Sequence, residues 1–164
     1  GDELSYLKEE IKNVIERIDT NNQTIRLSLL FYRDEGDQYV TRSFDFTTNI
    51  DEQFENINAQ RASGGGDFEE AVDVALDLAV NQASWDKNSN KILIHVLDAP
   101  PHSTKQNLNL FADSILKAAE KGIRIIPVAS SGIDKWTEFL LRTEAIVTGG
   151  TYTYITNHSK PQIY

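Results

Sequence analysis

The stretch Lys91–His102, KILIHVLDAPPH, decides the fold. Five of the six residues in 92–97 are apolar, which is typical of a strand buried on both faces of a parallel sheet. The run ends at Asp98, and Pro100 and Pro101 cannot donate a ladder hydrogen bond. A carboxylate is therefore expected at the carboxyl end of a central strand, where open α/β sheets bind ligands. Asp98 is also compatible with a local role as a turn cap.

Helical and strand patterns alternate on both sides of this stretch. Apolar residues recur at helical spacing in some segments and as short, nearly continuous runs in others. The imperfect alternation of residues 39–46 favours an antiparallel edge strand. The predicted fold is α/β and doubly wound, with a mostly parallel sheet and helices on both faces. The predicted helices cover residues 3–18, 48–61, 68–82, 104–121 and 134–143, and the predicted strands cover 25–32, 39–46, 91–97, 123–129 and 151–155.

The helix predicted over residues 104–121 has a clear apolar face. Gly122 follows it as a C-terminal stop. The pattern predicts inward positions for Leu108, Phe111, Ile115, Leu116 and Ala119.

The chain begins with the helical pattern of residues 3–18, whereas a sheet of this class is expected to have a strand before its first helix. The sequence therefore predicts that a first central strand precedes Gly1. Residues 1–164 would then be a single, N-terminally truncated domain. Without that strand, the strands at 25–32 and 91–97 would flank a gap, with unpaired backbone groups on both sides. Either a preceding segment or a strand of another chain is expected to fill it.

Composition narrows the classes of partner. A chain of 164 residues with 40% hydrophobic residues fits one folded domain. The net charge of −9 disfavours a nucleic acid or an anionic membrane as partner, and is compatible with a divalent cation or a basic protein surface. The absence of Cys excludes disulfides and Cys-ligated zinc. No apolar run is long enough for membrane insertion as a helix.

Polar loops are predicted to converge at one rim of the sheet, because parallel strands place their carboxyl ends on the same edge. Each of these loops follows a predicted strand or leads into a helix that feeds one. They contain Arg33 and Asp34, Ser63–Asp67, Asp98–His102 and Ser130–Gly132.

The glycine loop has three possible roles. Gly64–Gly66 before a helix could hold an anion on free N–H groups, although the loop lacks the Walker and dinucleotide patterns. Asp67, with Glu70 three residues later, could form a capping box. Asp67 could also join Asp98 in binding a hard cation through oxygen. Capping and cation binding are compatible with each other.

Signals for catalysis are weak. His95 lies in the middle of a strand pattern and favours a core position over a role as a base. His102 has no cysteine, and no serine on a nucleophile elbow, to activate. The spacing of the two rim carboxylates does not argue for acid–base chemistry. The sequence therefore predicts a protein that is not an enzyme, with a small hydrolase or phosphate-binding enzyme as an alternative.

Four motifs in this order resemble the von Willebrand factor type A domain. They are FYRDEGD at 31–37, SGGGDFEEAV at 63–72, ILIHVLDAPPH at 92–102 and IIPVASSG at 125–132. The resemblance is closest to the branch that carries a GGGD-x-x-E loop and a DAPxH turn. It implies a Rossmann-like fold over essentially the whole chain.

The resemblance also implies a metal-ion-dependent adhesion site at the carboxyl rim, which binds Mg²⁺ or Mn²⁺ and is completed by an acidic group of a protein partner. Asp98 corresponds to the family's Asp after the fourth strand. Gly66 stands at the usual Thr position, and we expect Asp67 to substitute as a ligand. The family's Asp-x-Ser-x-Ser motif would precede Gly1 and is absent from the chain. The expected ligand-binding rim comprises Asp34, Arg33, Ser63, Gly66, His102 and Ser130.

The sequence thus predicts a non-enzymatic adhesion or protein-binding module. A metal-free structural or assembly domain, in which Asp67 and Asp98 are only caps, is the alternative. The Asn-rich, Cys-free and acidic composition favours a bacterial protein that is secreted or in the cell envelope.

Overall fold

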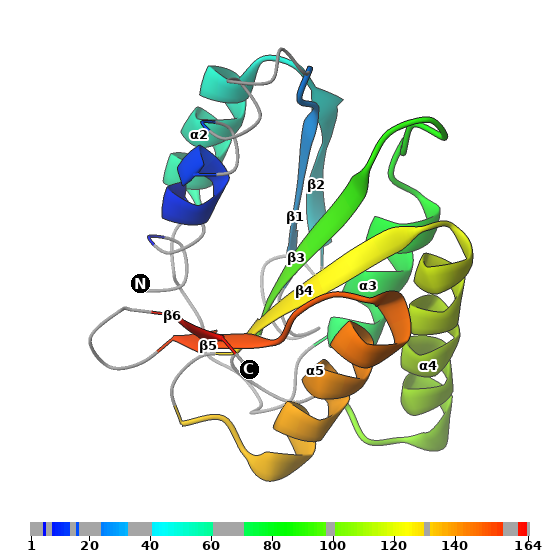
Figure 1. Ribbon diagram of the computed structural model, residues 1–164. Helices are drawn as coiled ribbons and strands as arrows, with labels where there is room; N and C mark the ends of the chain where they lie inside the picture. Colours follow the sequence, from blue (N-terminus) through cyan, green and yellow to red (C-terminus); the bar gives the residue numbers. More distant parts are fainter. Residues whose placement is uncertain are drawn as a thin grey trace.

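The computed structural model describes residues 5, 8–13, 16, 24–32, 41–60, 71–97, 101–129, 132–155 and 161–163. It confirms an α/β architecture in the order that the sequence predicts (Figure 1). The described residues within 5–16 are helical, as the pattern over 3–18 predicts. The elements are β1 (Leu27–Tyr32), β2 (Thr41–Thr47), α2 (Ile50–Ala59), α3 (Val72–Asn81), β3 (Lys91–Leu97), α4 (Lys105–Glu120), β4 (Ile123–Ala129), α5 (Lys135–Thr148), β5 (Thr153–Ile155) and β6 (Pro161–Ile163).

The strands form two sheets. One has the order β3-β4-β5-β6, in which β3, β4 and β5 are parallel and β6 is antiparallel to β5. The other is the antiparallel pair β1-β2, which confirms the antiparallel edge strand. Sequence patterns did not predict β6. Among the described residues, β1 and β3 share no ladder, although both strands run towards the same end of the molecule (Figure 1).

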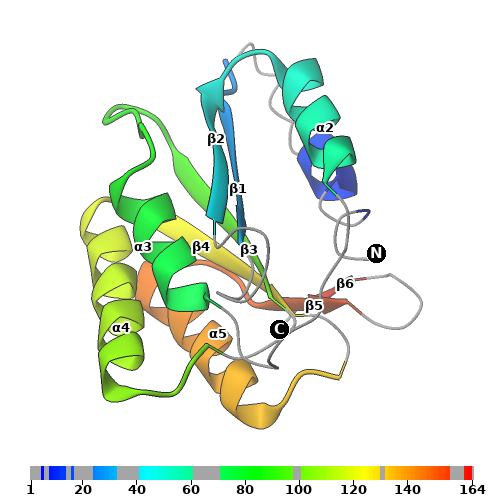
Figure 2. The same ribbon diagram turned by 180° about the vertical axis from the view of Figure 1, so that it is seen from behind.

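Helices lie on both sides of the strands. Figure 2 shows α3, α4 and α5 on one side, whereas α2 lies on the other side, against β1 and β2. The α2 contact includes Gln53, which is 1% exposed and whose Nε2 donates to the carbonyls of Leu27 and Asp45 at 2.8 and 3.1 Å. The main core lies between β3-β4 and the three helices; its fully buried members include Val72, Val80, Ala118, Ile123, Ile125 and Leu141.

The expectation that β3 is buried on both faces is wrong. Ile92 is 40% exposed, and Ile94 and Val96 are only half-buried. The latter two form a small cluster with Val128 that is separate from the main core. The reason is that α2 covers β1-β2 rather than this face of β3-β4. An apolar run indicates a strand, but it does not say how completely each face is covered.

The helix boundaries also bring corrections. α3 begins at Val72, later than the predicted start at residue 68, with Ala71 at its N-cap and no side-chain cap hydrogen bond; Asp67 and Glu70, the predicted capping box, lie outside the described residues. α5 continues past the predicted end at Thr143 to Thr148. In α4, Leu116 is 60% exposed and Ala119 is exposed, whereas Ser114 and Ala118 take the inward positions. The buried stripe therefore follows Phe111, Ser114, Ile115 and Ala118, the three- and four-residue spacing of one helix face.

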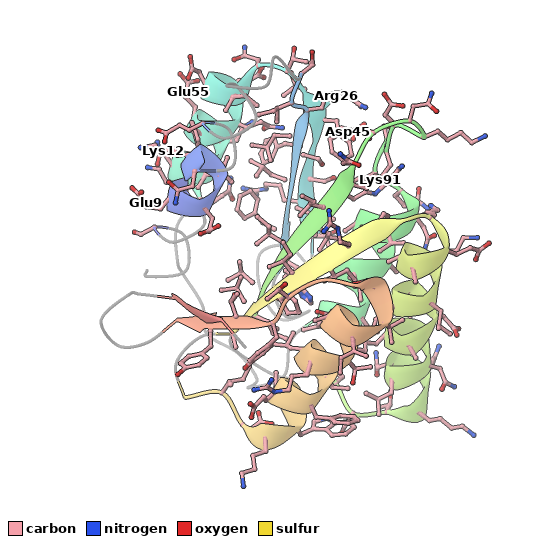
Figure 3. The ribbon with its side chains drawn as sticks, in the orientation of Figure 1. Glu9, Lys12, Arg26, Asp45, Glu55 and Lys91 are labelled. Atoms are coloured by element: carbon pink, nitrogen blue, oxygen red, sulfur yellow. The ribbon has the colours of Figure 1, made fainter. Side chains whose placement is uncertain are left out.

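Side chains connect the β1-β2 pair to the rest of the molecule. The Tyr32 hydroxyl donates to the Val96 carbonyl at 3.0 Å. At the opposite end of β1, Arg26 donates to the Ser84 carbonyl at 3.0 Å, and the Ser84 N–H and hydroxyl donate to the Asp45 carboxylate at 3.2 and 2.7 Å. The Ser84 hydroxyl is the main reason that the pKa of Asp45 lies below its ordinary value. Figure 3 shows Arg26 and Asp45 near Lys91, where β3 begins.

Candidate cation and partner-binding rim

The carboxyl ends of β1, β3 and β4 lie at one rim. Leu97 and Ala129, the last residues of β3 and β4, are register partners. Tyr32, the last residue of β1, hydrogen-bonds the carbonyl of Val96. The backbone segments that lead to Asp98 and to Ser130 therefore start side by side, and the segment that leads to Arg33 starts at the same rim.

The starts of three helices lie at the same side of the sheet. The Asn107 side-chain amide, in the first turn of α4, donates to Asp73 Oδ2 in the first turn of α3 at 2.8 Å. This bond holds the start of α3 beside the start of α4. Asp134 caps α5. Partial burial acts to raise the pKa of Asp134, but hydrogen bonds from the Thr137 N–H and hydroxyl, both at 2.8 Å, outweigh it and lower that pKa.

Most predicted site residues lie outside the described ranges. His102 is described and is half-buried, next to the buried Pro101. No three His, Asp or Glu side chains in the described part of the chain gather closely enough to hold a metal ion. The arrangement of the predicted ligands thus stays a prediction, while the described residues fix where their loops begin and end. Outside the described ranges are Arg33, Asp34, Ser63, Gly66, Asp67, Asp98 and Ser130.

Comparison with known proteins assigns the family. The model of the von Willebrand factor type A domain matches residues 1–159. The chain belongs to this family. Type A domains generally mediate protein interactions, so the chain is an interaction module at this coarse level.

Two curated relatives and one solved structure are similar to this type A domain. An ariadne-like RING finger protein of Acanthamoeba polyphaga mimivirus is 36% identical over 115 residues, which is 70% of this chain and 11% of that protein. The alpha-protein kinase vwkA of Dictyostelium discoideum is 32% identical over 83 residues, 51% of this chain and 13% of the kinase. The chain therefore matches only a small part of either relative.

The structural comparison supports the fold alone. The crystal structure of the conserved hypothetical protein BatB from Bacteroides thetaiotaomicron superposes with a TM-score of 0.61 over 91% of this chain and 80% of that chain, at 16% sequence identity. In the described part of the type A domain, no helix is long and apolar enough to cross a membrane.

Sequence reasoning missed a buried His–Glu pair behind the rim of this type A domain. His95 Nδ1 lies 2.8 and 3.0 Å from the two carboxylate oxygens of Glu144 in α5. His95 is 6% exposed and Glu144 is fully buried, so His95 occupies the core, with the Tyr32 ring 6.1 Å from its own. A signal for Glu144 existed in the sequence, because it shares the helical spacing of the buried Leu141 and Ala145.

Proposed function

We propose that this type A domain is a non-enzymatic protein-binding module whose carboxyl rim binds Mg²⁺ or Mn²⁺. The supporting observation is that the described ends of β1, β3 and β4 meet at one rim. The loops with the predicted ligands begin or end there. Asp98 and Asp67 would hold the cation, which would supply a positive charge for an acidic residue of the partner.

The chemistry of the donors fits such a cation. Carboxylate, carbonyl and hydroxyl oxygens are the ligands that Mg²⁺ and Mn²⁺ prefer. The buried Asp73 carboxylate, at the start of α3, has an oxygen, Oδ1, with no hydrogen-bond partner in the described part of the chain. Such an oxygen is compatible with a nearby cation or its bound water. Arg33, Asp34, Ser63, Gly66, His102 and Ser130 would contact the partner around the cation.

An exposed aromatic pair extends the proposed partner surface. Trp136 and Phe139, in the first turns of α5, are 45% and 59% exposed. Their rings stack at 5.7 Å with an interplanar angle of 16°. Exposed aromatic side chains are enriched at protein interfaces. We assign this pair to the partner contact because α5 begins directly after the Ser130–Gly132 loop.

Cation binding is expected to raise the melting temperature. A cation that binds only the folded state adds about 2.7 kcal/mol at 100 times its Kd, which for a domain of this size corresponds to about 5–10 °C. Melting is followed with and without millimolar MgCl₂ or MnCl₂. Asp98→Asn should abolish the shift, whereas Asp113→Asn, on an exposed position of α4, should keep it.

The outcome separates the cation-binding module from the metal-free assembly domain. Loss of the shift in Asp98→Asn alone supports the cation site. If neither cation moves the melting temperature of any variant, Asp67 and Asp98 are not ligands and the metal-free assembly domain takes precedence. Cleavage of a generic ester or phosphate monoester that disappears in Asp98→Asn would instead revive the enzyme alternative.

The names of the relatives do not change this choice. The kinase and RING finger descriptions refer to whole proteins of which this chain matches 13% and 11%. We propose that a type A domain of this kind contributes binding to its polypeptide rather than catalysis. We further propose an extracytoplasmic location, secreted or in the cell envelope, on the composition alone.

A further strand is proposed to lie between β1 and β3. The Tyr32 side chain bridges these strands, which share no backbone ladder among the described residues. β2 occupies one side of β1, and Ile11 of the preceding helix packs against Leu29 of β1. A helix that leads into a parallel strand normally crosses over from a neighbouring strand. No strand of the described residues pairs with the other side of β1, which we assign to that neighbour.

Amide hydrogen exchange tests this proposal. The β3 amides that do not bond to β4 are expected to exchange rapidly in the 164-residue chain. If residues that precede position 1 supply this strand, these amides should become protected in a chain that includes them, because a new ladder would satisfy them. Equal protection of these amides in both chains would contradict the proposal, and the amides that bond to β4 serve as the internal control.

A further inference from the structure

Asp73 is a buried carboxylate that uses only one of its oxygens. The residue is 1% exposed, and its Oδ2 accepts the hydrogen bond from Asn107. Its Oδ1 is buried and has no hydrogen-bond partner in the described part of the chain. A carboxylate can accept several hydrogen bonds, and a buried acceptor without a donor is costly. The structure therefore contains an oxygen that requires a donor or a positive charge.

Two other carboxylates in the described part of the chain accept hydrogen bonds through both oxygens. Asp134 accepts the Thr137 N–H with one oxygen and the Thr137 hydroxyl with the other. In the same way, Asp45 accepts the Ser84 N–H with one oxygen and the Ser84 hydroxyl with the other. Among the described residues, Asp73 is the carboxylate that has a buried oxygen without a hydrogen-bond partner. A place in the first turn of α3 is electrostatically favourable for Asp73, but it gives Oδ1 no partner.

The location of Asp73 connects it to the proposed cation. The Thr104 hydroxyl accepts the Asn107 N–H at 3.1 Å and also contacts Asn107 Oδ1. Thr104, Asn107 and Asp73 therefore form one polar chain across the starts of α4 and α3. These two helices begin directly after the segments that carry Asp98 and Asp67, respectively.

We infer that Asp73 is a positioning residue of the rim, whose free Oδ1 accepts a hydrogen bond from water bound to the cation while Oδ2 holds the start of α4. This inference rests on the proposed cation site. Mg²⁺ keeps several of its water ligands in proteins, and those waters need acceptors. Carboxylates outside the ligand shell that orient the ligands typically change metal affinity by about 10–100-fold.

The test is Asp73→Asn, which retains an acceptor for Asn107 and removes the charge at Oδ1. Titration with MnCl₂ by calorimetry is expected to show an affinity that is lower by about 10–100-fold. The melting temperature without metal should stay the same or rise, because an unpaired buried charge is removed. Water-proton relaxation of bound Mn²⁺ should also change, since the bound water loses its acceptor. Loss of a purely structural residue would instead lower the metal-free stability and leave the relaxation unchanged.

Asp77→Asn is the matched control. Asp77 lies one turn further along α3, and its carboxylate accepts a hydrogen bond from Asn81 of the same helix at 2.8 Å. The Asp77→Asn variant should bind Mn²⁺ with the same affinity as the unchanged protein. Asp73→Ser, which removes the carboxylate and leaves room for water beside Asn107, replaces Asp73→Asn if that variant does not fold.

The outcomes distinguish the two levels of the proposal. Unchanged Mn²⁺ affinity and relaxation in a folded Asp73 variant, with binding lost in Asp98→Asn, would overturn this inference and keep the proposed function. An unchanged protein that takes up no Mn²⁺, or an Asp98→Asn variant that binds normally, would overturn both.

Discussion

Replacing His95 with Phe is expected to lower the free energy of unfolding by about 3–5 kcal/mol, because it leaves a buried carboxylate without its partner. Glu144 is fully buried, and both of its carboxylate oxygens lie within 3.0 Å of His95 Nδ1. For a domain of this size the melting temperature should fall by roughly 10 °C or more. Urea unfolding with matched slopes measures the change directly.

A double replacement shows whether the loss of stability arises from the Glu144 carboxyl group that is left buried without its partner. His95→Phe with Glu144→Leu removes both polar groups and should recover much of the stability, since apolar substitutes for a buried ion pair are often neutral. Glu144→Leu alone leaves a buried histidine without its acceptor and should be destabilised relative to the double variant. If His95→Phe unfolds at the same urea concentration as the unchanged protein, the pair does not contribute to stability.

Gly150→Ala is expected to be the most damaging single-methyl change in the described part of the chain. A Cβ at this position would lie 1.7 Å from the Ile125 carbonyl oxygen and 2.7 Å from its carbon. These are backbone atoms of β4, so no flexible side chain can move aside. Overpacking typically costs about 1–3 kcal/mol, and this contact should reach or exceed that range because α5 must shift away from β4.

Two other glycines, Gly149 and Gly122, supply the controls for this clash. Gly149 ends α5 with a φ of 76°, and nothing lies within 4 Å of its added Cβ. Gly149→Ala should therefore cost only the left-handed backbone strain, about 1–2 kcal/mol. Gly122→Ala, at the end of α4 with the same φ and the same open space, should behave similarly. A Gly150→Ala variant as stable as these two would contradict the close contact. Urea unfolding compares all three.

Much of the fold could be predicted because the spacing of apolar residues and the residues that end helices and strands are local properties of the sequence. The strand at Lys91–Leu97 has the predicted bounds, and Thr104 and Gly122 delimit α4 because a capping side chain and a positive φ are encoded in single residues. Leu116 was misplaced because each residue advances about 100° around a helix, so the residue directly after the buried Ile115 lies on an exposed face. The partly open face at Ile92 could not be predicted, since it depends on which strands α2 covers.

The site could be predicted only in part. The convergence of loops follows from parallel topology, and the described strand ends obey it at Leu97 and Ala129. Asp73 and Glu144 were not selected, although each is an acidic residue within an apolar helical pattern. An acidic residue in such a pattern can lie exposed beside the apolar face of the helix, or it can be buried and bind a polar group of another element. The choice depends on the opposite element, here Asn107 and His95, which the sequence alone does not pair with them.

The junction between β1-β2 and the larger sheet has a mechanical consequence. Within the described residues, the hydrogen bonds that cross it come from side chains, at Tyr32 near the rim and at Arg26 and Ser84 at the far end, rather than from a backbone ladder. A pulling force that separates β1 from β3 would therefore break these side-chain hydrogen bonds one after another. A backbone ladder would instead resist through many hydrogen bonds loaded at the same time. In this chain, the junction is where the molecule should part first under tension, and Tyr32→Phe should weaken it at the end nearest the rim.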